Sequence, residues 1–180
     1  MIATLIYLFI FSHVLEERAQ AYPGVTYPVF LIPGLLMMAM LQNSFANSSS
    51  SLIQSKISGS IVFVLLSPLS YMEVFVAYVL ASIVRGFLVG AGIYLVILIF
   101  FDMPLQSLSW VFIFALIGNG FLGVLGVIAA IWAEKFDQLA AFQNFVILPL
   151  TFLSGVFCTI HSLPPFWESI SRFNPFFYVI

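Results

Sequence analysis

Residues 27–70 read YPVFLIPGLLMMAMLQNSFANSSSSLIQSKISGSIVFVLLSPLS, and this stretch decides the expected fold. It opens as an apolar segment that contains two prolines and a glycine. It then passes through a polar run from Gln42 to Ser51 and ends in a segment with one charge, Lys56, before the turn Ser67-Pro68. We therefore expect a membrane helix that leaves the bilayer through a polar exit and bends at the membrane surface.

The composition of the whole chain agrees with a membrane protein. Hydrophobic residues make up 63% of the 180 residues and charged residues 7%, whereas soluble domains carry about 25% charged residues. The mean hydropathy is +1.17. Three charge-free intervals, 19–55, 103–133 and 138–167, each exceed the roughly 20 residues that cross a bilayer. The sequence predicts an all-α, polytopic transmembrane helical bundle.

The apolar segments predict five crossings in one transmembrane domain that covers residues 1–180. The expected spans are 1–11 (partial), 27–47, 71–101, 109–133 and 139–160. The terminal apolar runs, 1–11 and 176–180, are too short to cross a bilayer. We therefore expect that residues are missing beyond both ends of this sequence.

Residues 48–70, called the elbow below, are expected to lie at the membrane surface. Leu52–Ile57 predicts a short surface helix that Gly59 interrupts. The following apolar run, 61–66, has six residues and stops at Ser67-Pro68, so it is too short to cross. A polar exit followed by such a bend is typical of a transport subunit that receives force from a partner outside the bilayer.

Three polar side chains within or near the spans have two interpretations each. Asn43 and Asn47 stand one turn apart on one helix face, either at the level of the lipid headgroups or facing a translocation path or subunit seam. Arg85 either reaches an interface or an acidic partner, or contributes to substrate binding.

Glycines inside the spans indicate close helix packing. Gly86 and Gly90 form a GxxxG pair, and the span 109–133 carries Gly118, Gly120, Gly123 and Gly126. No βαβ context surrounds the sequence GNGFLG, so the pattern does not predict a phosphate-binding loop.

Two polar segments follow the glycine-rich span. The loop 134–138 carries Glu134, Lys135 and Asp137. Segment 161–175 predicts an amphipathic surface helix in which Glu168 and Arg172 form an i,i+4 pair; its apolar face would hold Phe166, Trp167, Ile170 and Phe173. Basic residues do not orient the chain, because Arg18 and Arg172 on one face balance Lys56 and Lys135 on the other.

The sequence offers little for catalysis. His13, Cys158 and His161 are too few and too scattered for a metal site. Walker, GxSxG, HExxH and CxxC motifs do not occur. We expect a protein that is not an enzyme and holds no metal or cofactor. A secondary transporter driven by an ion gradient and a structural membrane scaffold are the alternatives to a force-driven transport subunit.

Several segments together resemble one family, the membrane-spanning permease of type-2 ABC exporters. The resemblance covers nearly the whole chain. The matching segments are FLIPGLLMM at 30–38, QNSFANSSSSL at 42–52, GSIVFVLLSPLS at 59–70, IVRGFLVG at 83–90, WAEKFDQLA at 132–140, PLTFLSGVF at 149–157, and then SLPPFW and FNPFFY.

The resemblance implies a dimer of six-span permeases in the bacterial inner membrane, bound to two cytoplasmic ATPase subunits that hold the ATP. It places residues 48–70 and 134–138 in the cytoplasm and 161–175 on the periplasmic side. The expected coupling residues in the elbow are Lys56, Gly59, Ser67 and Pro68. Family members often carry an acidic residue where Val62 and Phe63 stand here. The implied substrate is an amphiphile: a drug, a lipid or a lipid-linked glycan.

Overall fold

The computed structural model describes residues 6, 10, 20–22, 25–100, 108–156 and 165–179. Two short strands, β1 (Gln20–Tyr22) and β2 (Val25–Thr26), pair antiparallel, and helices form nearly all the rest of this part. The helices are α2 (Tyr27–Ile57), α3 (Ile61–Leu66), α4 (Tyr71–Phe100), α5 (Leu108–Trp132), α6 (Phe136–Phe142), α7 (Leu148–Phe152), α8 (Pro165–Phe173) and α9 (Pro175–Val179). The expected all-α bundle is thus confirmed there. His13, Cys158, His161 and most of the expected partial span 1–11 lie outside the described residues.

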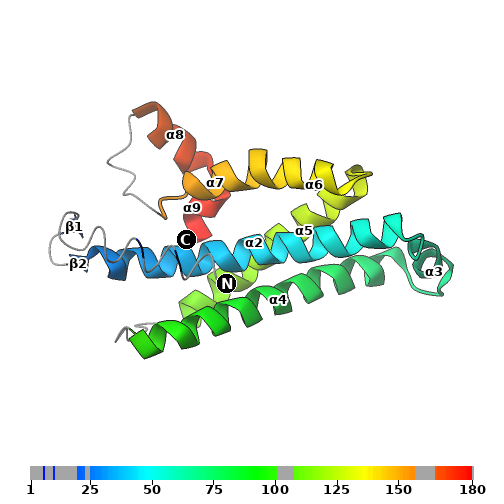
Figure 1. The fold of residues 1–180 in the computed structure, drawn as a ribbon, viewed down its shortest axis with the longest axis horizontal. Helices are drawn as coiled ribbons and strands as arrows, with labels where there is room; N and C mark the ends of the chain where they lie inside the picture. Colours follow the sequence, from blue (N-terminus) through cyan, green and yellow to red (C-terminus); the bar gives the residue numbers. More distant parts are fainter. Residues whose placement is uncertain are drawn as a thin grey trace.

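Three long helices, α2, α4 and α5, lie lengthwise against one another (Figure 1). Helices α2 and α5 run in the same direction along the bundle, and α4 runs antiparallel to both. The shared core draws buried side chains mainly from α2 and α5, among them Leu41, Phe45 and Ile53 from α2 and Leu122 and Ala130 from α5. The helix α2 is therefore the central element of the bundle.

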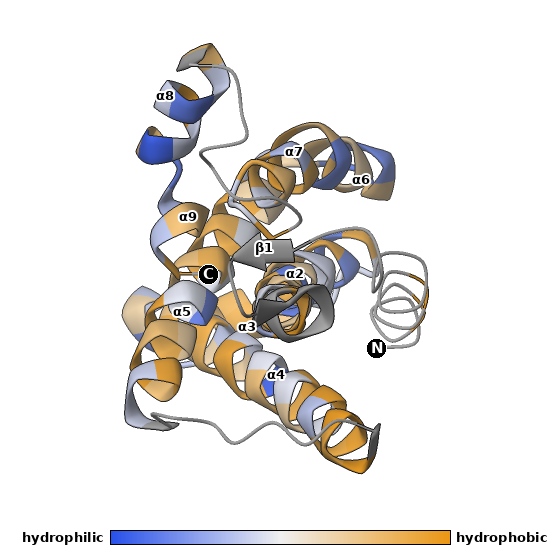
Figure 2. Ribbon diagram, turned by 90° about the vertical axis from the view of Figure 1, so that its left-hand side faces the viewer, coloured by the Kyte–Doolittle hydropathy of each residue, from blue (hydrophilic) through white to orange (hydrophobic). Residues whose placement is uncertain are grey.

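Two described helices are long and apolar enough to cross a bilayer. They cover Tyr71–Ile99 and Ser109–Trp132, and both present mainly hydrophobic residues in Figure 2. The spans predicted at 71–101 and 109–133 agree with them. The spans predicted at 27–47 and 139–160 stay predictions, because the polar run from Gln42 to Ser51 and the irregular backbone after Phe142 interrupt those segments.

Helix α2 continues ten residues beyond the expected end of its span at Asn47. The sequence predicted a break and a separate helix from Leu52, but α2 runs unbroken for 31 residues to Ile57. The serine hydroxyls bond to carbonyls of their own helix: Ser49 Oγ donates to Phe45 O at 2.7 Å and Ser55 Oγ to Ser51 O at 3.1 Å. Serines satisfied in this way need not end a helix. The helix ends near Gly59, whose φ of +74° suits glycine.

Pro149 disturbs the helix that follows the 134–138 loop. A π-helical segment, Gln143–Ile147, separates α6 from α7, and the Leu148 N–H bonds five residues back to Gln143 O. Proline has no N–H for the ordinary α-helical bond to Phe145, so the wider turn accommodates it. The span predicted over 139–160 stays a prediction; within it α7 ends at Phe152, and Gly155 takes a φ of +88° in the turn that follows.

Helix α8 is the amphipathic segment predicted near the end of the chain. Arg172 Nη2 donates to Glu168 Oε1 at 2.7 Å, which confirms the expected i,i+4 pair. Phe166, Trp167 and Phe173 are exposed. Asn174 joins this segment to α7: its Nδ2 donates to Leu150 O at 2.6 Å, while its Oδ1 accepts from the Phe176 N–H at 3.1 Å. One side chain thus caps the end of α7 and the start of α9.

Candidate functional site

The elbow ends in a short helix that stands clear of the bundle. No residue of α3 is buried, and the side chains of Phe63, Leu65 and Leu66 are each more than 75% exposed. Ser67 Oγ closes the helix by donating to Val64 O at 2.6 Å. Pro68 lies in the link between α3 and α4. The elbow therefore presents an apolar surface at one end of the molecule.

Lys56 joins the elbow to the end of α5. Its Nζ donates to three backbone carbonyls, of Ala130 at 3.1 Å, Ile131 at 3.0 Å and Ala133 at 2.6 Å. The last carbonyls of a helix have no intrahelical partner and carry the negative end of its dipole. The Lys56 ammonium supplies both hydrogen bonds and positive charge at this position. The role of Lys56 as a coupling residue stays a prediction; the structure shows that Lys56 caps a neighbouring helix.

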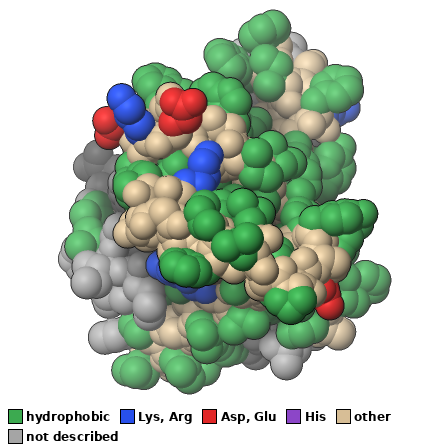
Figure 3. Space-filling view, turned by 90° about the vertical axis from the view of Figure 1, so that its right-hand side faces the viewer, with side chains coloured by type: hydrophobic (Ala, Val, Ile, Leu, Met, Phe, Trp, Pro, Cys, Tyr) green, Lys and Arg blue, Asp and Glu red, His purple; other side chains and the backbone are tan. Residues whose placement is uncertain are grey.

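The charged loop 134–138 follows directly from this joint. Glu134, Lys135 and Asp137 are exposed. Gln138 Oε1 accepts from the backbone N–H groups of Glu134 at 2.7 Å and Lys135 at 3.4 Å, which fixes the turn into α6. Figure 3 shows charged side chains beside hydrophobic ones on this end of the molecule. The structure thus brings together the two segments that the resemblance assigns to the cytoplasm.

A buried polar cluster, called the seam below, joins the three long helices in mid-length. Ser44 Oγ on α2 lies 2.7 Å from Asn119 Oδ1 on α5 and 2.9 Å from Ser82 O on α4. All three residues are fully buried. A hydroxyl carries one proton, so Ser44 donates to one of these acceptors at a time. The Asn119 Nδ2 atom has no hydrogen-bond partner in the described part of the chain.

Glycines make room for the seam. A Cβ at Gly86 would collide with Ser44 Oγ and with the Asn119 side chain, and a Cβ at Gly123 would collide with Ser82 Oγ. Gly126 similarly faces Ser48 Oγ. Gly90 faces the thioether of Met40 and Gly118 faces Leu41 and Val179, whereas a Cβ at Gly120 would meet only Ile83 at an ordinary 3.6 Å. Gly120 alone among the predicted packing glycines would accept a Cβ at ordinary van der Waals contact.

Two of the polar residues singled out in the sequence contact each other. Arg85 Nη1 on α4 donates to Asn47 Oδ1 on α2 at 3.0 Å. Asn43 instead donates from Nδ2 to Ala39 O of its own helix at 2.9 Å. Arg85 is exposed, so its charged group is not enclosed within the bundle. Its hydrogen bond to Asn47 ties α4 to α2 on the elbow side of the seam.

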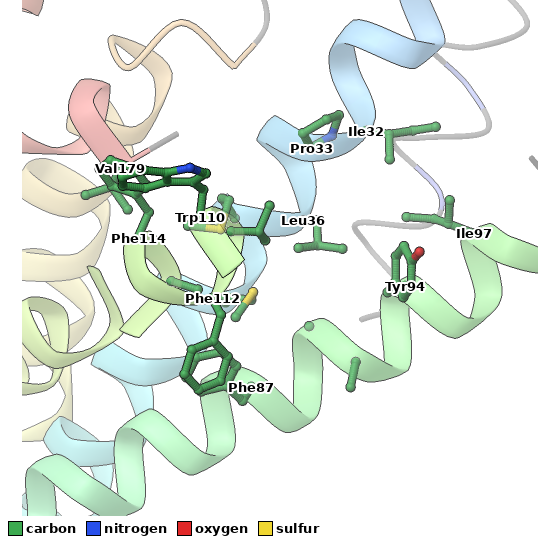
Figure 4. A pocket seen from close by; sticks show the side chains of 16 residues that line it. Ile32, Pro33, Leu36, Phe87, Tyr94, Ile97, Trp110, Phe112, Phe114 and Val179 are labelled. Carbon is green, nitrogen blue, oxygen red and sulfur yellow. The ribbon is translucent and has the colours of Figure 1, made fainter. Parts of the chain in front are cut away.

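An apolar cavity of about 420 Å³ lies on the other side of the seam, between α2, α4, α5 and α9. Figure 4 shows Leu36 and Pro33 from α2, Phe87 and Tyr94 from α4, and Phe112 from α5 around it. The rings of Phe87 and Phe112 stack with centroids 4.9 Å apart. Ligand cavities of this volume with mainly apolar walls are common in proteins. This one suits hydrocarbon rather than a charged group.

The seam residues were not singled out as site residues from the sequence. Asn119 carries a signal that could have identified it, because it is the amide side chain within an otherwise apolar and glycine-rich span. Polar side chains buried in membrane helices commonly hydrogen-bond between helices. Ser44 and Ser82 carry no comparable signal, since serine is tolerated on many helix faces.

The chain matches known proteins over its whole length. The family model described as ABC-2 type transporter matches residues 1–180. The "Inner membrane transport permease YadH" of Escherichia coli strain K12 is 34% identical over 182 residues, which cover 100% of this chain and 70% of the relative. "Nodulation protein J" of Rhizobium leguminosarum bv. trifolii is 27% identical over 173 residues, which cover 95% of this chain and 66% of the relative.

No solved structure matches the chain. The expected location in the bacterial inner membrane is confirmed, because the YadH permease is an inner membrane protein and two helices of this chain can cross a bilayer. The match over all 180 residues also confirms the resemblance noted in the sequence. The chain belongs to the ABC-2 type transporter family of membrane permeases.

Proposed function

We propose that this chain is the membrane-spanning subunit of an ATP-binding cassette exporter and that it moves an amphiphilic substrate across the inner membrane. It hydrolyses no ATP itself; a separate cytoplasmic ATPase binds the nucleotide, and a second copy of the permease completes the path. The family match favours this function over the ion-driven secondary transporter and over the structural scaffold.

The observation that carries the proposal is the exposed surface formed by α3 and the loop 134–138. Phe63, Leu65 and Leu66 project from a helix with no buried residue, and the loop that carries Glu134 and Lys135 joins α5 to α6 at the same end of the molecule (Figure 1). Apolar side chains with a charged rim are typical of protein interaction sites. We place this end in the cytoplasm, where it would receive the ATPase.

The remaining topology follows from that placement. The five crossings would run between this surface and the opposite end, with α8 on the periplasmic side. The exposed Phe166 and Phe173 of α8 would then lie at the periplasmic surface of the inner membrane, as the apolar face of an amphipathic helix does. The apolar cavity lies beside the first half of α2. Its apolar walls could contact the hydrocarbon part of a substrate, which favours an amphiphilic substrate.

A matched pair of substitutions tests the proposed ATPase contact. Phe63→Asp places a charge in the middle of the exposed α3 surface, and Phe173→Asp places the same charge on a comparably exposed phenylalanine of α8. The full-length protein is purified from its native membrane, and Walker-motif ATPases that co-purify are quantified by mass spectrometry.

We expect an ATPase to co-purify with the unaltered protein and with Phe173→Asp, and to be lost from Phe63→Asp, because desolvating a carboxylate in an apolar contact is costly. If Phe63→Asp retains the ATPase in full, or if Phe173→Asp loses it equally, α3 is not the contact. If transport continues with no ATPase and follows an ion gradient, the proposed function is wrong.

A further inference from the structure

The ends of α2 and α5 coincide at the elbow. The two helices run in the same direction, and their last residues, Ile57 and Trp132, lie toward the same end of the bundle (Figure 1). Parallel helices that end together bring two negative dipole ends to one place. Lys56 lies in the last turn of α2, and its ammonium contacts the last carbonyls of α5. One positive charge therefore serves both helix ends.

The hydrogen bonds of Lys56 use its full donor capacity. A lysine ammonium carries three N–H groups, and Nζ has three carbonyl acceptors within 3.1 Å. A lysine serving only as a surface charge need not meet several backbone acceptors at once. The side chain thus holds the end of α5 and the first residue of the following turn, Ala133, against the end of α2.

Beyond the end of α2 the elbow has few contacts with the bundle, whereas Leu52 and Ile53 in its first part are buried in the core. Helix α3 buries no residue, a Cβ at Gly59 would meet nothing within 4 Å, and Ile61 is the α3 residue that packs against the core. Force applied to α3 would therefore reach the bundle through the end of α2 and through the short link to α4. The Lys56 contacts lie three residues before Gly59 and would pass that force on to α5.

We infer that Lys56 is a positioning residue that holds the elbow and the 134–138 loop together as one unit, so that a push on α3 moves the ends of α2 and α5 together. This inference rests on the proposed function, in which the ATPase acts on α3. It goes further by stating that the partner meets one composite surface rather than two independent loops.

A distance measurement on the permease alone tests whether Lys56 holds the elbow and the 134–138 loop together. With Cys158 replaced by serine, spin labels are placed on Ser60→Cys and Asp137→Cys, both exposed positions on either side of the joint. The distribution of distances between the labels is measured in lipid bilayers by double electron–electron resonance. The variants are Lys56→Met, Lys56→Arg and Lys56→Gln. Lys135→Met is the matched control because it removes a nearby positive charge from an exposed side chain.

We expect one narrow distribution for Lys56, Lys56→Arg and Lys135→Met. Lys56→Met should widen it by about twofold or more, because the end of α5 frays without its cap. Lys56→Gln keeps hydrogen-bond donors without the charge and should give an intermediate width; it also serves if Lys56→Met fails to insert. A narrow distribution in Lys56→Met or Lys56→Gln, or a wide one in Lys56→Arg, would overturn the inference.

The two proposals can fail separately. The distance measurement needs no ATPase, so a narrow distribution in Lys56→Met refutes the unit even if Phe63→Asp abolishes ATPase binding. Conversely, a protein that binds no ATPase could still show the Lys56-dependent distance. In that case the joint exists, and the proposed source of force is wrong.

Discussion

Gly86 and Gly90 stand one turn apart on α4, yet they face two different kinds of packing. Gly86 touches the seam, where Ser44 and Asn119 meet in a fully buried hydrogen bond. Gly90 borders the apolar cavity and faces the thioether of Met40. The sequence presents the two glycines as one GxxxG motif, and the structure separates them by environment.

The difference predicts that one helix interface combines a fixed part at the seam and an adaptable part beside the cavity. In the seam, small residues let the backbones approach and the polar groups specify a single arrangement. Beside the cavity, the flexible side chains of Met37 and Met40 can change rotamer into free volume. For a protein that must move a substrate, the seam would keep three helices in register while the cavity walls adjust.

The largest effect is expected from Gly86→Ala, which disturbs the packing of the seam. The new methyl group would collide with Ser44 Oγ and with the Asn119 side chain, and overpacking of this kind costs about 1–3 kcal/mol. We expect a matching loss in the free energy of unfolding, measured in detergent micelles by tryptophan fluorescence during denaturant titration.

Gly120→Ala is the control for this experiment, because a Cβ there would meet only Ile83 at 3.6 Å. It should be neutral or slightly stabilising, since alanine is favoured over glycine in helices by up to about 1 kcal/mol. Equal losses from Gly86→Ala and Gly120→Ala would contradict the idea that the seam is the fixed part.

The sequence predicted the membrane class and the helices 71–101 and 109–133 well, because long apolar runs need no knowledge of packing. It failed at the end of α2, since the polar run from Gln42 to Ser51 looks like a loop unless the hydroxyls are known to bond within the helix. It did not reveal the π-helical segment before Pro149, because the consequences of a proline depend on local backbone geometry.

The site was only partly predictable for a similar reason. Lys56 and the loop 134–138 could be singled out because charges are rare in this chain. That the Lys56 ammonium caps α5 depends on two helices ending together, which a linear pattern does not reveal. Likewise the pairing of Arg85 with Asn47, and of Ser44 with Asn119, depends on the relative rotation of helices far apart in the sequence.

A smaller effect is expected from Ser44→Ala, which removes the central hydroxyl of the seam without adding volume. Hydrogen bonds between membrane helices contribute about 0.6 kcal/mol on average and up to about 1.7, and we expect a loss of unfolding free energy in this range. The control is Ser50→Ala, because Ser50 is exposed on the same helix and bonds only weakly, at 3.5 Å, to Asn47 O. If Ser50→Ala lowers the unfolding free energy as much as Ser44→Ala does, the buried hydrogen bond stabilises the protein no more than the exposed one.

The smallest effect is expected from Gly90→Ala, which probes the adaptable part. The added methyl group would approach the thioether of Met40, but that side chain lines the cavity and can turn into it. A changed rotamer costs about 0.5–1.5 kcal/mol, and the helix preference of alanine over glycine offsets up to about 1 kcal/mol of it. The unfolding free energy should therefore change far less than in Gly86→Ala under the same conditions. A loss as large as that of Gly86→Ala would mean that the cavity walls are as rigid as the seam, and the contrast between the two glycines would then lie in chemistry alone and not in mobility.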